Sequence, residues 1–546
     1  MKKHALILFA ALLMVSAHVK AEETNTLFFL HNAPMRHQIN PAFQNVSDGY
    51  VMFIPALGHS SLWVGNNSLT VSDVLFQDKT TGRVITPLHP NADRQQFFNA
   101  IRNSWLIGVN SSNSLLGFGF RIKDFGYVNV NMMLRVESGL TLPHDLFSTL
   151  FGGGIALDGA TDMDLKPLGF QLQMYNEVGL GYSHKINPQW TVGGKVKFLM
   201  GMLTLGMRND QLSLNAGVDQ WHLAGKTTLS LGAPLEYQNL PKDFNPETIA
   251  NTDWSSLVNI DPDNIVHSIA SLIAPNGYGA AFDLGATYKP IDMLEISLSV
   301  TDLGFIYWHR GRSMTFAMDT TFAGVGDFEY SDYVINGQFR TDSLLGTTMS
   351  TLSGLGSALR QTASKDGFCQ MVSAKINVGV QANFLNNILS AGLISRTRFF
   401  NGRAYEELTI GGTVRPCNWF NFALTYSLID NAKGSSIGTG LSIMPYDGIN
   451  LTLAADYVPL SFARMHIDEE KQITLPYKYK GLNLAFGISI VWGTNKEKEK
   501  TDTDTGLTEK PITTEDEVAP ADTEEPQVES EPVIEDEEIR RLESTI

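Results

Sequence analysis

A stretch near the C-terminus, Lys480 to Gly493, alternates strictly between large apolar side chains and mostly small or polar ones. The even positions from Leu482 to Trp492 are all apolar, and the odd positions hold Gly, Asn, Ala, Ser and Val. Because side chains of a β-strand alternate faces with period two, one face of this strand is apolar throughout. A soluble sandwich strand would also look like this. The length, close to the 9–11 residues of a tilted membrane strand, and the aromatic Trp492 at its end favour an outer-membrane β-barrel.

The same alternation recurs from Ser104 onward, for example in Val128 to Val136, Leu172 to Tyr182 and Leu294 to Val300. There are about eighteen such runs, and some of them are expected to be hairpins above the membrane, so about 14–18 strands span it, in an even number. The sequence therefore predicts an all-β fold, an antiparallel transmembrane outer-membrane β-barrel over residues 103–493. Before it, residues 22–102 are predicted to form a plug-like N-terminal segment and the first strands, with Ser68 to Val71 among these strands.

Loop lengths give an independent argument for a barrel. Short turns such as Ile186 to Pro188 and Lys289 to Ile291 all fall at one end of the predicted strands, and the long inserts fall at the other. These inserts span 142–166, with a short helix at 144–150, and 234–276, 341–367 and 460–477; we expect helix within the second and third. Short periplasmic turns and long extracellular loops are typical of outer-membrane barrels. The pattern therefore predicts extracellular inserts.

The two ends of the chain differ from this pattern. Residues 1–21 contain Lys2 and Lys3, a short apolar stretch and a small residue, Ala21, as expected of a signal peptide. Residues 494–546 hold 18 acidic and 6 basic residues and few apolar ones. Such a composition does not support a core. We predict a disordered periplasmic tail, which either tethers a basic periplasmic protein or only aids solubility.

Composition narrows the class of protein. The chain has 43% hydrophobic residues and a net charge of −17, and after the N-terminus it contains no run of about 18 apolar residues that would form a membrane helix. The acidic balance does not predict a nucleic-acid partner. Its two cysteines, Cys369 and Cys417, leave two interpretations open: one disulfide, or two separate thiols in the barrel wall.

No motif predicts an enzyme, a metal site or a cofactor. Residues Gly434 to Gly438 match G-x-S-x-G, but they sit between predicted strands and lack the strand–turn–helix context of a nucleophile elbow. Several charged residues instead share the inward phase of their strands, where they would select or bind a solute, or pair with one another in a purely structural barrel. These lumen candidates are Glu177, Lys195, Lys197, Asp283, Glu295 and Arg415.

The segment Asn25 to Phe43, with N-T-L-F-F followed by N-P-A-F, resembles the start of a Bacteroidota outer-membrane barrel family of unknown function (DUF5723-like). More distantly, its Asn40-Pro41-Ala42 resembles the long-chain fatty-acid transporter superfamily, which includes the PorV-like barrels of type IX secretion. The resemblance implies that Asn40, Pro41 and Ala42 lie within the barrel as part of a plug. It does not extend to a fatty-acid site, and the acidic tail is not a general feature of these proteins.

Two functions follow as expectations. The first is uptake or binding of a small, hydrophobic solute by a barrel surrounded by outer-membrane lipid. The second is a barrel that does not transport and docks secreted, surface or periplasmic proteins. An apolar lumen beside Asn40 would favour the first, and a lumen sealed by packed polar side chains would favour the second.

Overall fold

The computed structural model describes residues 24–493 except 79–83, 87–88, 90, 102–103, 124, 152–160, 218–219, 235–273, 324–333, 336–337, 340–359, 418, 430–433, 447, 460–461, 467–471 and 478–480. The chain divides into two compact units, Met1–Thr494 and Asn495–Ile546, and the described residues all belong to the first. The predicted signal peptide, the acidic tail and most of the insert 234–276 lie outside the described residues.

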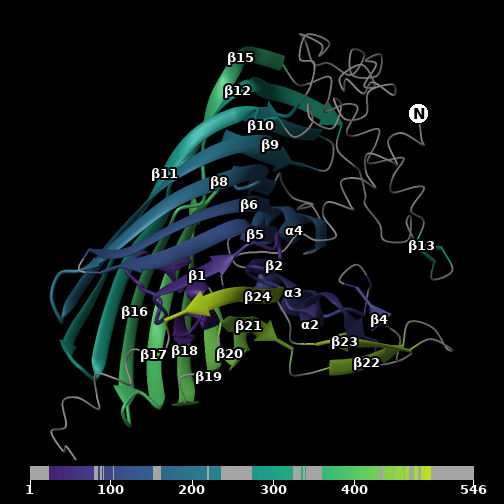
Figure 1. The fold of residues 1–546 in the computed structure, drawn as a ribbon. Coiled ribbons are helices and arrows are strands. Elements are labelled where there is room, and N and C mark those ends of the chain that lie inside the picture. The colour runs from purple at the N-terminus through teal and green to yellow at the C-terminus, as the bar shows by residue number, and fades with distance from the viewer. Residues whose placement is uncertain are drawn as a thin grey trace, which may run out of the picture. The chain divides into compact units, whose positions relative to one another are not determined.

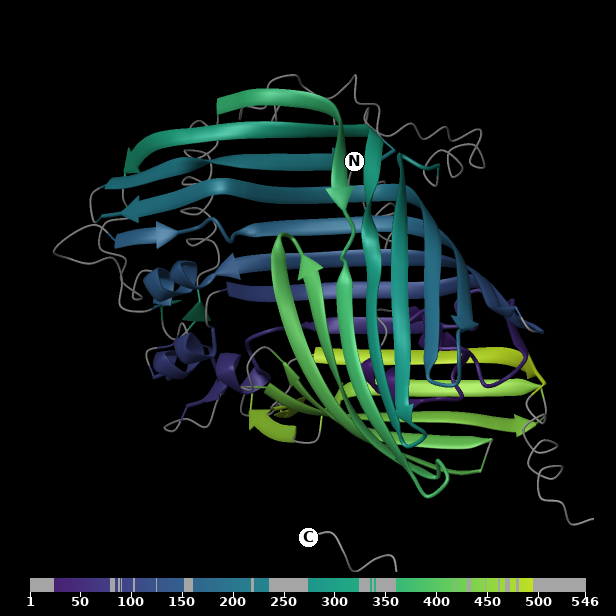
Figure 2. The same cartoon turned by 90° about the vertical axis from the view of Figure 1, so that its left-hand side faces the viewer.

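Fourteen strand positions of the described chain form a closed antiparallel barrel (Figures 1 and 2). The wall strands are β1 (Gly49–Met52) with β2 (Ser60–Asn66), β5 (Ser104–Ile122), β6 (Gly126–Pro143), β8 (Gly169–Lys185), β9 (Trp190–Ala216), β11 (Gly277–Ile291), β12 (Leu294–Ala323), β16 (Lys375–Phe384), β17 (Leu389–Phe400), β18 (Arg403–Cys417), β19 (Phe420–Ile429), β20 (Gly434–Tyr446), β21 (Ile449–Val458) and β24 (Gly481–Trp492). β1 and β2 share one position and close the ring, because both pair with β24 on one side and with β5 on the other.

The remaining elements lie beyond the barrel wall or inside it. They are η1 (Asn25–Phe29), η2 (Pro34–Gln38), α2 (Val71–Val74), β3 (Phe76–Gln77), β4 (Val84–Ile85), α3 (Arg94–Ala100), α4 (His144–Phe151), β7 (Thr161–Asp164), β10 (Gln220–Gly232), β13 (Val334–Ile335), β14 (Gln338–Phe339), β15 (Arg360–Met371), β22 (Phe462–His466) and β23 (Gln472–Pro476). None of the helices among the described residues is long and apolar enough to cross a membrane.

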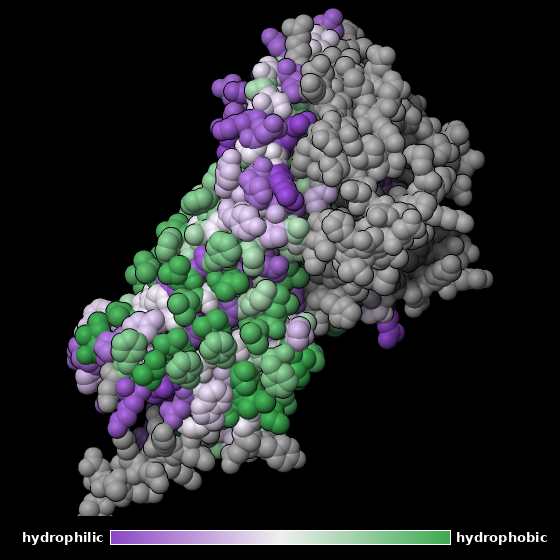
Figure 3. Space-filling model, turned by 45° about the horizontal axis from the view of Figure 1, so that its top comes forward, coloured by the Kyte–Doolittle hydropathy of each residue, from purple (hydrophilic) through white to green (hydrophobic). Residues whose placement is uncertain are grey.

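The outward face of the wall is apolar, as the alternation predicted. On β24, Ile488, Ile490 and Trp492 are exposed, whereas the residues between them are buried. On β11, Leu284 is 64% exposed and its neighbour Asp283 is 1% exposed. Figure 3 shows the apolar side chains as a belt with polar residues at both ends. A closed barrel with such a belt is the architecture of an outer-membrane barrel, which confirms the predicted fold class.

Aromatic side chains mark both ends of the belt. Trp190 and Tyr288 stack with ring centroids 4.5 Å apart at one end, and Tyr278 stacks on His309 at 5.4 Å at the other. A strand rises about 3.4 Å per residue and is tilted by about 40° from the barrel axis. The ten-residue step from Tyr278 to Tyr288 on β11 therefore covers about 26 Å along that axis. This height matches the apolar band of about 25 Å that an outer-membrane barrel presents to lipid.

Two local predictions were wrong. Residues 68–71 do not form a strand: Thr70 and Asp73 form a capping box, in which the Thr70 N–H donates to Asp73 Oδ2 at 2.8 Å, and this starts helix α2. Residues 360–367, in the insert expected to be helical, belong to strand β15, because they pair in register with β12. The helix predicted at 144–150 is present as α4.

An arginine at Ile488 should lower the free energy of unfolding by about 2–4 kcal/mol, because it would place a charge in the apolar belt near its middle. The control is Ala317→Arg, on the outward face of β12 beyond the belt, with an expected effect within about 0.5 kcal/mol. Urea titration of both variants refolded into lipid vesicles measures the difference. Equal stabilities would contradict the assignment of this face to lipid.

Candidate functional site

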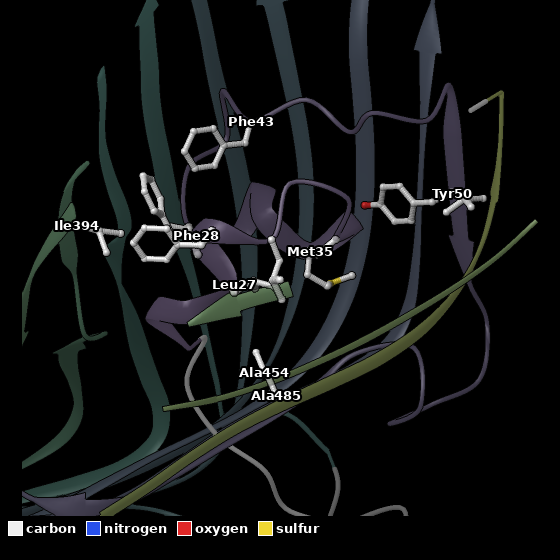
Figure 4. Packing of buried hydrophobic residues seen from close by; sticks show 14 of the residues in the cluster. Leu27, Phe28, Met35, Phe43, Tyr50, Ile394, Ala454 and Ala485 are labelled. Carbon is white, nitrogen blue, oxygen red and sulfur yellow. The ribbon is translucent and has the colours of Figure 1, made fainter. Parts of the chain in front are cut away.

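Residues 24–43 pass through the interior of the barrel and are almost entirely buried. Leu27, Phe28, Phe29 and Leu30 are at most 2% exposed, and together with Met35 they form one hydrophobic cluster with wall residues (Figure 4). The wall residues in this cluster include Tyr50, Ile394, Ala454 and Ala485, which come from strands far apart in the sequence. The segment therefore fills the barrel at this level.

Asn40, Pro41 and Ala42 lie against the inner face of β9, β11 and β12. The Asn40 amide Nδ2 donates to the carbonyl oxygens of Ala286 (3.3 Å) and Leu298 (3.2 Å), and its Oδ1 accepts from the N–H of Ala42 at 2.9 Å. The Asn40 side chain thus forms hydrogen bonds both to the irregular N-terminal segment and to the barrel wall. Irregular backbone is tolerated at membrane depth only where protein or water covers it.

Wall glycines leave the space that this segment occupies. A Cβ at Gly193 would lie under 3.0 Å from the carbonyl of Pro41, and one at Gly285 equally close to the Asn40 side chain. Gly379 and Gly411 face the rings of Phe28 and Phe29 in the same way. The small residues of the inward phase therefore form a seat for the N-terminal segment.

Replacing Gly193 with valine should displace Pro41 and weaken the docking of the segment, because the β-carbon would overlap backbone that cannot move alone. The neighbouring Gly194 is a matched control: it faces outward, and the nearest atoms to its added Cβ are 3.6 and 3.7 Å away. Trypsin cleavage after Arg36, which is 7% exposed, reports the displacement. Trypsin should cleave Gly193→Val at least ten-fold faster than the parent, and it should cleave Gly194→Val at the parent rate. Equal rates for the two variants would contradict the role of Gly193 in seating the N-terminal segment.

Asp456 of β21 anchors the start of the segment. Its carboxylate accepts the N–H of Asn25 (2.8 Å), the N–H of Thr26 (3.1 Å) and the Thr26 hydroxyl. Asn483 of β24 donates to the same carboxylate at 3.1 Å. Asp456 is 1% exposed, so this anchor lies in the interior of the barrel.

Three of the predicted lumen residues, Glu177, Lys197 and Asp283, meet in a buried ion cluster. Lys197 Nζ lies 2.8 Å from Asp283 Oδ2 and 3.7 Å from Glu177 Oε1, and it donates to Asp302. Arg135 Nε lies 2.7 Å from Glu177, and Lys375 Nζ lies 3.1 Å from Asp302. All six side chains are at most 5% exposed, and their three positive and three negative charges balance. Pairing of this kind offsets the cost of removing charges from water.

The other predicted residues do not join the cluster. Lys195 is buried on β9, and its Nζ has no hydrogen-bond partner among the described residues. Glu295 lies toward the short-turn end of β12, where its carboxylate is 3.1 Å from Lys289 Nζ. Arg415 is half-buried near the end of β18.

Sequence reasoning missed Arg135, Asp302 and Lys375 as members of the cluster. Asp302 lies at a β-bulge, where the register of β11 and β12 shifts and two residues oppose Asp283; its φ is +59°. The signal was present in the sequence, because the apolar phase changes from Leu298 and Val300 to Leu303 and Phe305. Arg135 and Lys375 lie in the inward phase of their strands, but alternation does not indicate which residues they contact across the interior.

At the end of the barrel with the long connections, the β17–β18 hairpin leans across the interior. Phe400 packs against Gly139 of β6, and Arg403 donates to the hydroxyl of Ser104 in β5. A pocket that is partly open to solvent lies between this hairpin and the opposite wall. It is lined by Trp63, Gly65, Asn66, Asn67, Leu106, Arg396, Arg398, Tyr405, Glu406, Glu407, Tyr457, Gly481 and Asn483.

The pocket adjoins the anchor of the N-terminal segment. Asn483 both lines the pocket and donates to Asp456, and Tyr457 follows Asp456 directly. Asp456 and Tyr457 are consecutive and both buried, because Tyr457 has φ +60° at a register shift of β21 and so both side chains turn inward.

The two cysteines lie away from the pocket. Cys369 is exposed, Cys417 is half-buried, and both thiols are free, so the structure has two separate cysteines.

Comparison with solved structures finds two toluene transporters and a FadL homologue at low identity. The Ralstonia pickettii toluene transporter TbuX is 11% identical, with a TM-score of 0.36, covering 84% of this chain and 94% of its own. The Pseudomonas putida toluene transporter TodX is 11% identical, with a TM-score of 0.35, covering 86% and 98%. A Pseudomonas aeruginosa FadL homologue is 11% identical, with a TM-score of 0.36, covering 87% and 100%. A search of curated proteins finds no match.

The chain belongs to the Family of unknown function (DUF5723), whose model matches residues 41–456. The match begins within the Asn40-Pro41-Ala42 stretch and covers the wall as far as the anchor residue Asp456.

Proposed function

We propose that this member of the family takes up or binds a small solute at the outer membrane, in the pocket beneath the β17–β18 hairpin. The proposal rests on the pocket, which is a concave interior site whose lining combines three aromatic rings with convergent polar groups. The rings suit the apolar surface of a solute, and the polar groups suit its hydrogen-bonding atoms.

In this proposal the N-terminal segment is a plug that separates the pocket from the periplasm. The long connections face outward, the short turns and the tail 494–546 face the periplasm, and a solute enters from outside. Since residues 24–43 fill the barrel below the pocket, passage requires the plug to move. Charged residues of the lumen, including Lys195 and the ion cluster, then hold the wall in shape and border the route.

Deletion of residues 22–45 tests the plug. The variant should conduct ions in planar bilayers, whereas the full chain should remain closed most of the time, because no other described segment fills the barrel at that level. A variant that lacks the tail 494–546 is the control and should behave like the full chain. Unchanged conductance after the first deletion would contradict the plug and, with it, transport through the barrel.

A second candidate function is docking of secreted or surface proteins. β9 has 27 residues and β12 has 30, far more than the 9–11 that cross the bilayer, and β10 and β15 pair with their outer parts. Figure 1 shows β9, β10, β12 and β15 side by side at one end of the barrel. This sheet stands beyond the apolar belt and offers a surface that solute uptake does not require.

A photo-crosslinking residue at Ala317, on the outward face of that sheet, tests docking in intact cells. A specific protein adduct, absent when the same residue replaces Leu284 on the lipid-facing wall, would support docking. A barrel that yields no adduct at Ala317 and still binds a solute would leave uptake as its function.

A further inference from the structure

The lining of the pocket carries polar groups that a pure hydrocarbon would leave unsatisfied. Leu106 is its single aliphatic side chain, and the charged side chains of Arg396, Arg398 and Glu407 and three asparagines lie beside the aromatic rings. Sites for apolar ligands are lined mainly by hydrophobic side chains, with few polar groups. A hydrocarbon would displace water from these groups without replacing its hydrogen bonds, which costs about 1–3 kcal/mol for each group left unsatisfied. The ligand should therefore carry hydrogen-bonding groups.

The buried charges in and beside the pocket balance, which favours a ligand without net charge. Arg396 and Arg398, each under 10% exposed, line one side, Glu407 follows on the adjacent strand β18, and the anchor residue Asp456 adjoins the pocket. The carboxylate of Glu406 lies on the other, exposed face of β18, where it accepts from Ser395 Oγ. An anion would gain from the two guanidinium groups and lose to the two carboxylates, and a cation would do the reverse. Because the opposed terms offset, the pocket has no built-in preference for either sign.

Two acceptors of the lining are buried without a donor among the described residues: Glu407 Oε1 and Asn483 Oδ1. Asn483 uses its Nδ2 to hold Asp456, so its carbonyl oxygen is the atom left over. The guanidinium groups of Arg396 and Arg398 bring donors to the same pocket. A ligand that fits must donate to the acceptors and accept from the arginines, and a hydroxyl group can do both.

Aromatic rings supply the remaining recognition. Trp63 of β2, Tyr405 of β18 and Tyr457 of β21 approach the pocket from different strands. A pyranose ring has flat C–H faces that pack on aromatic rings and a rim of hydroxyl groups, and it is neutral. We therefore propose, resting on the solute-binding function above, that the pocket binds a neutral saccharide.

Binding of defined probes to the full chain tests this inference. The probes are maltose, cellobiose, N,N′-diacetylchitobiose and lactose, with toluene as the hydrocarbon probe, in a detergent without a sugar headgroup. Saturation-transfer NMR should detect at least one disaccharide, with transfer strongest to the ring C–H protons. Its affinity should fall at least ten-fold in Trp63→Phe and in Glu407→Gln. Trp190→Phe, on the lipid-facing belt, is the matched control and should bind like the parent.

The outcomes separate the inference from the function on which it rests. If toluene binds competitively at the pocket and no disaccharide binds, the saccharide is wrong and solute binding stands. If disaccharide binds equally to the parent and to both pocket variants, the assignment to this pocket is wrong. If no probe binds and deletion of 22–45 leaves conductance unchanged, both the saccharide and solute uptake fail. Retention of the heat-sensitive gel mobility of a folded barrel shows that each variant is folded.

Discussion

Replacing Lys197 with methionine should lower the free energy of unfolding by about 3–5 kcal/mol, the usual effect of removing one partner from a buried ion pair. Lys197 contacts Asp283, Asp302 and Glu177, and the substitution would remove the cation that all three buried carboxylates share. Methionine keeps most of the volume of the side chain, so the loss in the free energy of unfolding measures the missing charge rather than a change in packing. Urea unfolding of the refolded barrel in lipid vesicles measures it.

The matched control is Lys289→Met. Lys289 also faces a carboxylate, Glu295 at 3.1 Å, but its side chain is 48% exposed. Surface ion pairs contribute about 0–1 kcal/mol, so this variant should be close to the parent. Equal destabilisation by the two substitutions would show that the interior of the barrel is well hydrated, and the cluster would lose its role in holding the wall.

Replacing Asp456 with alanine should release the start of the N-terminal segment. Three hydrogen bonds from the segment end on this carboxylate, and leaving the buried donors unsatisfied costs about 1–3 kcal/mol for each donor. For the three donors this sums to roughly 3–9 kcal/mol lost from the docked state. Trypsin should then cleave after Arg36, and channel openings should become frequent in planar bilayers.

Two variants control this experiment. Asp456→Asn keeps one oxygen as an acceptor and should show an intermediate effect. Asp319→Ala removes an exposed aspartate of β12 that pairs with His222 at 2.9 Å, and it should leave both measurements unchanged. If Asp456→Ala remains closed and resistant to trypsin, the apolar cluster around Phe28 and Phe29 holds the plug without the anchor.

Of the two features that were expected to separate the two functions, the lumen beside Asn40 shows the one that favours docking, and an aromatic pocket is present at another level of the barrel. Beside Asn40 the wall is polar and packed: Ser299 Oγ donates to the carbonyl of Ile39 at 2.7 Å, and Asn377 Nδ2 donates to the same oxygen at 3.1 Å. The aromatic pocket lies farther along the barrel, beyond the anchor at Asp456. A closed polar level and an open binding level therefore coexist, and for this reason we propose solute binding coupled to a movable plug rather than a permanent pore.

Local alternation along the chain was enough to predict the wall. Whether a side chain such as Ile488 or Asp283 faces lipid or the interior depends only on its position in its own strand, since period two is a property of the backbone. The inward phase of Glu177, Lys197 and Asp283, the helix at 144–150 and the contrast between short turns and long inserts follow from the same local rules. Each could be predicted without knowing any neighbour in space.

Contacts across the interior were decided only by the tertiary structure. Lys197 meets Asp302 because a bulge in β12 turns an extra residue inward, and Arg135 and Lys375 reach the same cluster from strands that are distant in the sequence. The pocket exists because the β17–β18 hairpin leans toward β5 and β6, where Phe400 finds space at Gly139. Alternation determines the face of a strand but not which residues meet across the barrel, because that depends on register, bulges and the shape of the closed wall.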